Sequence, residues 1–274
     1  MNLASLPDKL SALIFSYLPR NEQTLVLSEA TAAELDDDKP SLPLDSLRFS
    51  GLERVFTEPH VTALRSGSRH FVIDGFLADR SLSVLDTRAE AVRLLSEGRM
   101  RRAGMVAASA SAQPEGFDVP TATDKFVESS LRGDSLVWLN DQVLLDLPAV
   151  QSAVTAMRAA LGELEHVCGF VASKTTVQLA HYGAGARYVR HLDATRQHAP
   201  GRRITMLLYL NPAWTAADGG ELRLFQRRED GDETSTDIAP VGDRLLVFQS
   251  HGVPHEVLES RAESRFSLTL WAYV

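Results

Sequence analysis

Residues 182–193, with the sequence YGAGARYVRHLD, carry the pattern that decides how this chain is interpreted. The stretch ends in His191-Leu192-Asp193, so a histidine and an aspartate stand two positions apart. Side chains at alternate positions of a strand point to the same side, and His191 and Asp193 can therefore reach the same ion. Such pairs are common on protein surfaces, so this one gains weight only from the residues that follow it downstream.

Two downstream features complete a candidate metal site. His255 lies in the sequence Pro254-His255-Glu256-Val257, and Arg265 follows it by ten residues. Two histidines and one carboxylate on one face of an ion, with the opposite face open, are the ligand set of non-haem Fe(II) oxygenases. His251 competes with His255 for the third position, but the Pro-His-Glu-Val context and the spacing to Arg265 favour His255.

Arg265 is the candidate anchor for an anionic co-substrate. Its neighbours Phe266, Leu268 and Leu270 are apolar, which predicts a buried or half-buried strand. A buried arginine needs an anionic partner, and its planar fork suits a carboxylate. With the metal ligands, this arginine indicates a 2-oxoglutarate-dependent oxygenation. The alternative is a surface cation on the last strand.

Composition narrows the class of protein. The chain has 274 residues, of which 44% are hydrophobic, enough for a sizeable core. With 28 basic and 36 acidic residues its net charge is -8, which argues against nucleic-acid and membrane-surface partners. Cys168 is the only cysteine, so no intrachain disulfide forms. Without a signal-like N-terminus or a long apolar run, we expect a soluble intracellular protein, in the cytoplasm or the nucleus.

The first half of the chain has mainly helical patterns. Apolar spacing predicts helices within residues 1–35, and the charged, proline-bearing residues 36–43 are the best linker candidate. The other elements expected before residue 175 are a strand running into a turn at 70–77, helices at 81–96 and 145–164, and a long loop at 108–133. A loop of this length in a compact domain is usually a binding loop or disordered, and we expect this one to close over a peptide substrate.

The sequence of the second half predicts short strands separated by turns. The expected strands are Thr175–His181, Ile204–Leu210, Glu221–Gln226, Arg244–Gln249 and Arg265–Tyr273. Helices followed by strands predict an α+β chain in which the strands form a jelly roll, with its core at about 175–274.

The C-terminal half resembles the prolyl hydroxylase domain family of oxygenases, which includes the oxygen-sensing hydroxylases and their bacterial relatives. The resemblance covers about residues 65–274 and rests on RGD at 132–134 with Trp138, YGAGARYVRHLD at 182–193, YLN at 209–211 with Trp214, GGELR at 219–223, DRLLVF at 243–248, PHEV at 254–257 and RFSLTLW at 265–271. It implies a double-stranded β-helix core carried on N-terminal helices.

The resemblance also implies roles for individual residues. His191, Asp193 and His255 would ligate iron, and Arg265 and Tyr209 would hold the C5 carboxylate of 2-oxoglutarate. Further expected site residues are Tyr182 lining the co-substrate pocket and Arg202 on the substrate side. The implied cofactors and co-substrates are Fe(II), 2-oxoglutarate and O2, with ascorbate as an optional addition.

Several of these residues have a plainer interpretation. Tyr209 lies in an apolar strand and is alternatively a core tyrosine. Ser267 shares a strand face with Arg265, so its hydroxyl is a further candidate for co-substrate binding. Trp271 is either a substrate-side aromatic or a core residue. Gly219-Gly220 is expected to be only a turn.

Residues 1–50 offer a second, weaker resemblance. The segment from Leu6 to Pro19 is similar to an F-box, whose helices dock an adaptor of ubiquitin ligases. The pattern is short and apolar, so a helical hairpin packing on the oxygenase domain is the favoured interpretation.

The favoured function is hydroxylation of a prolyl residue in an extended segment of a protein substrate, as in peptidyl-proline 4-dioxygenases. The rival hypotheses are an oxygenase acting on another residue or a small molecule, a jelly-roll binding module without catalysis, and a ubiquitin-ligase adaptor that carries an oxygenase domain. An intact ligand set with Arg265 argues against the binding module.

Overall fold

The computed structural model describes residues 55–65, 68–103, 105–106, 125–126, 132–195, 199, 201–227 and 231–274. Its helices are α3 (Glu58–Arg65), α4 (Val84–Ser96), α5 (Asp141–Leu144) and α6 (Pro148–Cys168), with short 3-10 turns η3 (Ala78–Arg80) and η5 (Ala216–Asp218). Its strands are β1 (His70–Asp74), β2 (Arg101–Arg102), β3 (Met105–Val106), β4 (Lys125–Phe126), β5 (Ser135–Trp138), β6 (Lys174–Tyr182), β7 (Tyr188–His191), β8 (Arg202–Tyr209), β9 (Leu222–Arg227), β10 (Glu233–Ile238), β11 (Arg244–Gln249), β12 (His255–Val257) and β13 (Arg265–Tyr273).

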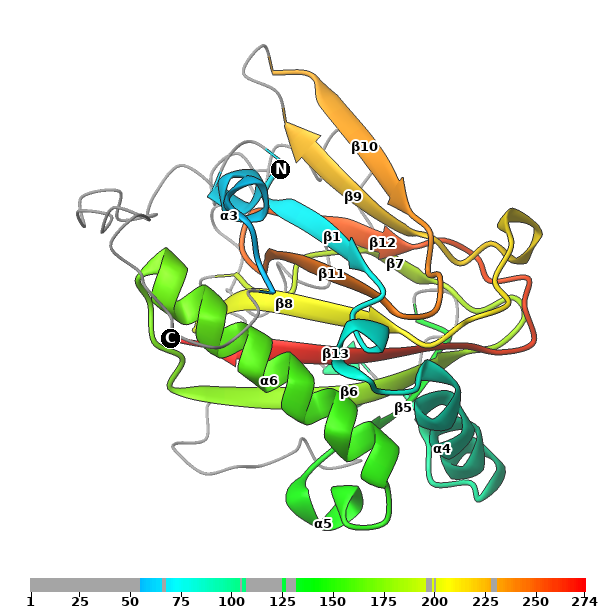
Figure 1. Ribbon diagram of the computed structural model, residues 1–274. Coiled ribbons are helices and arrows are strands. Elements are labelled where there is room, and N and C mark those ends of the chain that lie inside the picture. The colour runs from blue at the N-terminus through cyan, green and yellow to red at the C-terminus, as the bar shows by residue number, and fades with distance from the viewer. Residues whose placement is uncertain are drawn as a thin grey trace.

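Two antiparallel sheets form the body of the described chain. The major sheet has the order β1-β11-β8-β13-β6-β5-β2, and the minor sheet has the order β10-β9-β12-β7 (Figure 1). Strands that are neighbours in one sheet come from distant parts of the sequence, as in the pairing of β6 with β13. This is the double-stranded β-helix, or jelly roll, that the sequence predicts, and the α+β class is confirmed.

The alternation of side chains along β13 divides the interior in two. Phe266, Leu268 and Leu270 point to one face of the major sheet and pack in a large apolar cluster with residues of α6. Figure 1 shows α6 lying across this face. On the opposite face, Tyr209 packs with Leu224 and other residues of the minor sheet in a second, smaller cluster. The polar residues of β13 share this second face, so the site lies between the two sheets.

The two helices that the sequence predicts in the described region are present, with shifted ends. The first begins at Val84, because the Ser83 side chain accepts a hydrogen bond from the Asp86 N–H and caps the helix. The second begins at Pro148 and ends at Cys168, where Gly169 adopts a left-handed conformation with φ +72°. Among the described helices, none combines the length and apolar character that crossing a membrane requires.

The five strands listed for the second half are all present within a few residues, but the list omits three others, two of which carry the histidines that the metal-ligand argument places on strands. They are β7, β10 and β12. Strand β12 has only three residues, and β10 is polar and mostly exposed, so neither has an apolar alternation that a sequence pattern could reveal.

The prediction of a long loop at 108–133 is wrong at residues 125–126, which form a strand. Lys125–Phe126 pairs with Met105–Val106 in a short two-stranded sheet, because backbone pairing needs no apolar pattern in so short a strand. Residues 107–124 and 127–131 lie outside the described residues. So do residues 1–54, with their predicted helices, linker and F-box-like segment, and the domain boundaries stay a prediction.

A buried polar contact fixes the start of β13. The Asn211 side chain donates to the carbonyls of Pro240 and Phe266 at 2.9 and 3.1 Å, and its oxygen accepts from the Phe266 N–H at 2.8 Å. Arg88 of α4 donates to the same Asn211 oxygen at 3.0 Å. One asparagine thus ties a helix and two loops to the residue next to Arg265.

Asn211→Ala should therefore lower the free energy of unfolding. Each buried group left without its hydrogen bond costs about 1–3 kcal/mol, and urea unfolding followed by circular dichroism measures the loss. Asp146→Asn, at an exposed side chain, is the control and should stay within about 0.5 kcal/mol of the parent. Equal midpoints for the two variants would contradict the role given to Asn211.

Candidate metal centre and carboxylate pocket

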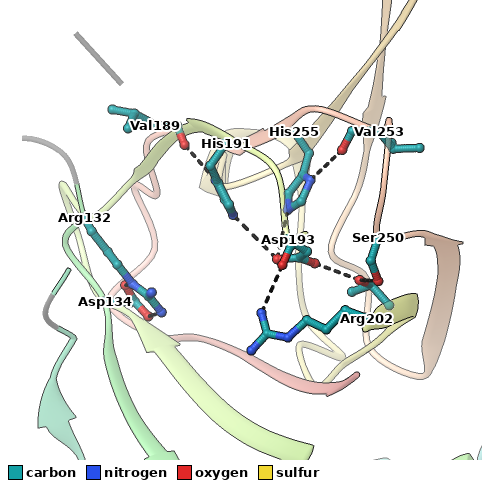
Figure 2. A network of polar contacts seen from close by, with 10 residues as sticks. Arg132, Asp134, Val189, His191, Asp193, Arg202, Ser250, Val253 and His255 are labelled. Carbon is teal, nitrogen blue, oxygen red and sulfur yellow. Dashed lines mark hydrogen bonds and ion pairs between the residues drawn. The ribbon is translucent and has the colours of Figure 1, made fainter. Parts of the chain in front are cut away.

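The structure brings together His191, Asp193 and His255. His191 ends β7, His255 begins β12, and the two residues are register partners in the minor sheet. Their Nε2 atoms lie 3.9 and 3.8 Å from Asp193 Oδ1, and one ligand atom from each residue lies within 4.8 Å of the others (Figure 2). His251 is not a member of this group, so the geometry favours His255, as the sequence pattern does.

Both imidazoles are oriented by backbone carbonyls. His191 Nδ1 lies 2.8 Å from the Val189 carbonyl, and His255 Nδ1 lies 3.0 Å from the Val253 carbonyl. A carbonyl only accepts, so each Nδ1 must carry the hydrogen. Each Nε2 then presents a lone pair to the centre, which is the orientation that a metal ligand needs.

Charge states in the centre suit a cation. Burial, and after it the neighbouring His255, lowers the pKa of His191 to about 3, so this imidazole is neutral at physiological pH. The pKa of Asp193 is lowered as well: burial alone would raise it, but the neighbouring His255 and His191, and after them the Arg202 guanidinium, outweigh burial. The centre therefore offers a neutral His191 nitrogen and an ionised carboxylate, and a divalent metal requires ligands in these states.

The two oxygens of Asp193 have different surroundings. Oδ2 accepts a hydrogen bond of 2.7 Å from Thr205 Oγ1, which lies 2.9 Å from Ser250 Oγ. Oδ1 is the oxygen that faces both histidines. Because Oδ2 is engaged, Asp193 presents one oxygen for coordination. Thr205 and Ser250 are fully buried and were missed in the sequence, where a lone hydroxyl near apolar residues carries no signal.

Arg265 is a buried cation with an incomplete set of partners. It is 1% exposed, and its Nε donates to the Gly220 carbonyl at 2.7 Å. In the part of the chain that the structure describes, both of its terminal nitrogens and the buried Tyr209 hydroxyl have no hydrogen-bond partner. Burial raises the pKa of Tyr209 to about 12, so its phenol remains a donor. Unpartnered buried donors are costly, and a carboxylate would satisfy all three.

Aromatic rings and a tight turn surround this guanidinium. The rings of Tyr182 and Tyr209 lie 4.9 and 5.3 Å from its central carbon. Gly219 and Gly220 have φ angles of +60° and +72°, and a Cβ on Gly220 would lie 2.9 Å from Arg265 Cδ. The expectation that Gly219-Gly220 is only a turn is therefore incomplete, because the turn holds and makes room for Arg265. Ser267 lies on the same strand face, opposite Tyr209 in the register.

The two expected substrate-side residues lie beside the metal centre. Arg202 donates to the backbone carbonyl of Asp193 at 3.2 Å (Figure 2). It also donates to the Tyr273 hydroxyl at 2.7 Å. Its guanidinium lies 4.5 Å from the ring centroid of Trp271. Trp138, 5.7 Å from Trp271 between ring centroids, extends this aromatic group. The indole nitrogen of Trp138 is buried and without a partner among the described residues.

Comparison with known proteins identifies the class to which this region belongs. Residues 177–273 match the 2OG-Fe(II) oxygenase superfamily, and they contain the metal centre and Arg265. This part of the chain is a domain of that superfamily, for which Fe(II) and 2-oxoglutarate are the characteristic cofactor and co-substrate. The unpartnered donors described above fit the co-substrate's carboxylate, and the His-Asp-His group fits the metal.

The curated relatives include prolyl hydroxylases. Prolyl hydroxylase EGLN3 of Homo sapiens is 34% identical over 154 residues, which are 52% of this chain and 59% of the relative. The chain thus aligns with somewhat more than half the length of this relative. An uncharacterised PKHD-type hydroxylase of Synechocystis is 31% identical over 121 residues, 40% of each chain.

Solved structures agree with the fold. A Pseudomonas putida prolyl-4-hydroxylase superimposes with a TM-score of 0.59 and 29% identity, over 78% of this chain and 97% of the other. A Trichoplax adhaerens prolyl hydroxylase, solved with a peptide fragment of the oxygen degradation domain of hypoxia inducible factor, gives a TM-score of 0.61 and 24% identity, over 78% and 87% of the two chains. At that identity the second likeness concerns the fold alone.

His255→Ala should abolish Fe(II) binding, because it removes one of the three clustered ligand atoms. Isothermal titration under anaerobic conditions measures the loss. His251→Ala is the matched control, four residues away, and should keep most of the parent affinity. The reverse pattern would assign the third ligand to His251.

Arg265→Lys should weaken the binding of 2-oxoglutarate to the Fe(II)-loaded protein. Lysine keeps the charge but lacks the planar fork, and charge-assisted hydrogen bonds are worth about 1.5–3 kcal/mol each, so the dissociation constant should rise about tenfold or more. Arg244→Lys, at the surface pair with Asp74, is the control. An unchanged constant for Arg265→Lys would move the carboxylate anchor elsewhere.

Proposed function

We propose that this protein is an Fe(II)- and 2-oxoglutarate-dependent dioxygenase that hydroxylates a prolyl residue in an extended segment of a protein substrate. The observation that carries the proposal is the pairing of two incomplete sites between the two sheets, one with its histidines on the minor sheet and one on the major sheet. A three-ligand metal group and a buried arginine with unpartnered donors are together what a metal-chelating dicarboxylate needs at its two ends.

Each end of the co-substrate has its own residues in this assignment. His191, Asp193 and His255 hold the iron, and Arg265 with Tyr209 binds the distal carboxylate. When bound, iron and 2-oxoglutarate supply the oxidative step, in which O2 is divided between succinate, formed with release of CO2, and a hydroxyl group on the substrate. The protein contributes orientation and the exclusion of water, and the burial of Arg265, Tyr209 and His255 supports that role.

Tyr182 and Ser267 complete the co-substrate pocket in this proposal. The Tyr182 ring lies against the Arg265 guanidinium, and burial raises the pKa of its phenol, so this ring remains neutral. Ser267 follows Arg265 on the same face of β13, and its hydroxyl is buried. Both residues narrow the space around the carboxylate without adding a competing charge.

The substrate side is assigned to Arg202 and Trp271, with Trp138 beside them. A residue that precedes proline is held extended, and its carbonyl is a hydrogen-bond acceptor. The unpartnered Trp138 indole N–H and the Arg202 guanidinium supply donors for such carbonyls, and the indole faces supply an apolar surface for the proline ring. The names of two similar proteins, prolyl hydroxylase EGLN3 and the Pseudomonas putida prolyl-4-hydroxylase, support the same substrate class.

Two rival functions from the sequence remain distinct from this proposal. An oxygenase acting on another residue or on a small molecule would use the same metal centre and differ only on the substrate side. A ubiquitin-ligase adaptor would depend on residues 1–50, which lie outside the described residues, and a pull-down with that segment tests it. Nucleic acid and membrane are not among the proposed partners.

The proposal is tested by incubating a cell lysate, and then candidate peptides, with the protein, Fe(II) and 2-oxoglutarate. The expected result is one added oxygen atom on a proline, located by tandem mass spectrometry, with succinate formed in step. A peptide with that proline replaced by alanine and the His255→Ala protein are the controls. Oxygen on another residue would remove the prolyl assignment, and no coupled succinate would remove the oxygenase assignment.

A further inference from the structure

A stack of three side chains lies against one ligand of the metal centre. The Tyr188 ring is stacked on the His191 imidazole, with 3.7 Å between ring centroids and 19° between planes. The Arg132 guanidinium lies 4.5 Å from the centroid of Tyr188. Neither Tyr188 nor Arg132 is a member of the metal group itself.

The outer layer of the stack is fixed by a buried carboxylate. Arg132 donates to both oxygens of Asp134, from Nε at 2.7 Å and from Nη2 at 3.0 Å, and the Asp134 side chain is fully buried. Figure 2 shows this pair on the same side of the centre as His191. A two-pronged contact of this kind fixes the plane of the guanidinium as well as its position.

Backbone contacts also hold the segment of Arg132 beside the strand of Tyr188. Arg132 forms an isolated bridge with Tyr188, and the Gly133 N–H donates to the Arg187 carbonyl at 2.9 Å. A Cβ on Gly133 would lie 3.0 Å from the Ala186 Cα, so a larger residue would fit only if the neighbouring backbone moved by a few tenths of an ångström. The RGD sequence at 132–134 is thus built to lie against the strand that carries His191.

The His191 ring has one constraint from its hydrogen bond and needs another. The bond from Nδ1 to the Val189 carbonyl sets which nitrogen faces the metal, but a single bond leaves the ring free to tilt about it. The stack on Tyr188 covers one face of the ring and restricts that tilt. The His255 ring, 4.3 Å away at 58°, is tilted and does not stack on it.

A purely stabilising role explains less of this arrangement. A buried ion pair is weak evidence for stability, since apolar residues of similar volume often serve as well. Arg132 and Asp134 supply a flat cation of fixed orientation over the electron-rich face of Tyr188. Apolar residues would not supply this.

We propose that Tyr188, held by Arg132 and Asp134, is the positioning residue for His191 and thereby sets the affinity and geometry of the metal centre. The inference rests on the proposed function, because it assumes that a divalent metal binds His191, Asp193 and His255. Tyr188 and Arg132 touch neither the metal nor the co-substrate in this assignment; they act through the imidazole.

The test uses Co(II) as the probe, because its visible absorption bands report both affinity and ligand geometry. Titration of the full chain should show that Tyr188→Leu weakens Co(II) binding about 10- to 100-fold, the usual effect of losing a group that orients a ligand, and shifts the bands. Tyr188→Phe keeps the ring and should restore both. Wild-type affinity and bands in Tyr188→Leu would overturn the proposal.

A matched pair of arginine variants separates positioning from general stability. Arg190 also makes a two-pronged contact with a carboxylate, that of Glu233, and it is buried. Its side chain points to the opposite side of β7 from His191. Arg132→Lys should weaken Co(II) binding and shift the bands, whereas Arg190→Lys should leave both unchanged, with urea unfolding recorded for each apoprotein.

Equal losses of metal affinity in Arg132→Lys and Arg190→Lys would overturn the proposal, since the effect would then follow stability. Failure of this inference leaves strong Co(II) binding by the wild type intact. Absence of Co(II) binding by the wild type would overturn the proposed function together with the inference, so the two failures are distinguishable.

Discussion

The cation of Arg265, buried between the two sheets, is the constraint on which the rest of the site depends. Its Nε is engaged by the Gly220 carbonyl, and the described residues leave both terminal nitrogens without a partner. A buried charge in this state is costly, so the surrounding fold has to hold it in place. The Asn211 contacts at the start of β13, the glycine turn and the two tyrosine rings perform that task. The pocket is therefore organised before any carboxylate enters it.

The alternation along β13 places this charge and the apolar core in the same strand. One face supplies Phe266, Leu268 and Leu270 to the large cluster with α6, and the other supplies Arg265, Ser267 and Trp271 to the space between the sheets. A shift of one residue in register would exchange the two faces. The apolar packing that stabilises the fold therefore also turns Arg265 into the space between the two sheets.

The sequence predicted most of this where a local pattern was strong. The alternation at 265–273 and the long apolar helix follow from spacing. The set of His191, Asp193, His255 and Arg265 follows from spacing together with the family resemblance. What it missed depends on contacts between distant segments. Polar strand β10 is a strand only because β9 pairs with it, and Thr205 and Ser250 become meaningful only when folding brings them to Asp193. Tyr188 lies within the 182–193 stretch, but a role for it is indicated only by its stack on His191.

The three proposed metal ligands are each held through the atoms that do not face the centre. Carbonyls engage Nδ1 of both histidines, and Thr205 engages Oδ2 of Asp193. Two Nε2 nitrogens and one Oδ1 oxygen do not take part in these supporting bonds, and they lie close together in the centre. Because the supporting atoms lie on β7, β8 and the loop before β12, the centre is rigid only if both sheets are in register. The metal geometry is in this sense a property of the whole jelly roll rather than of the His-Leu-Asp sequence that first indicates it.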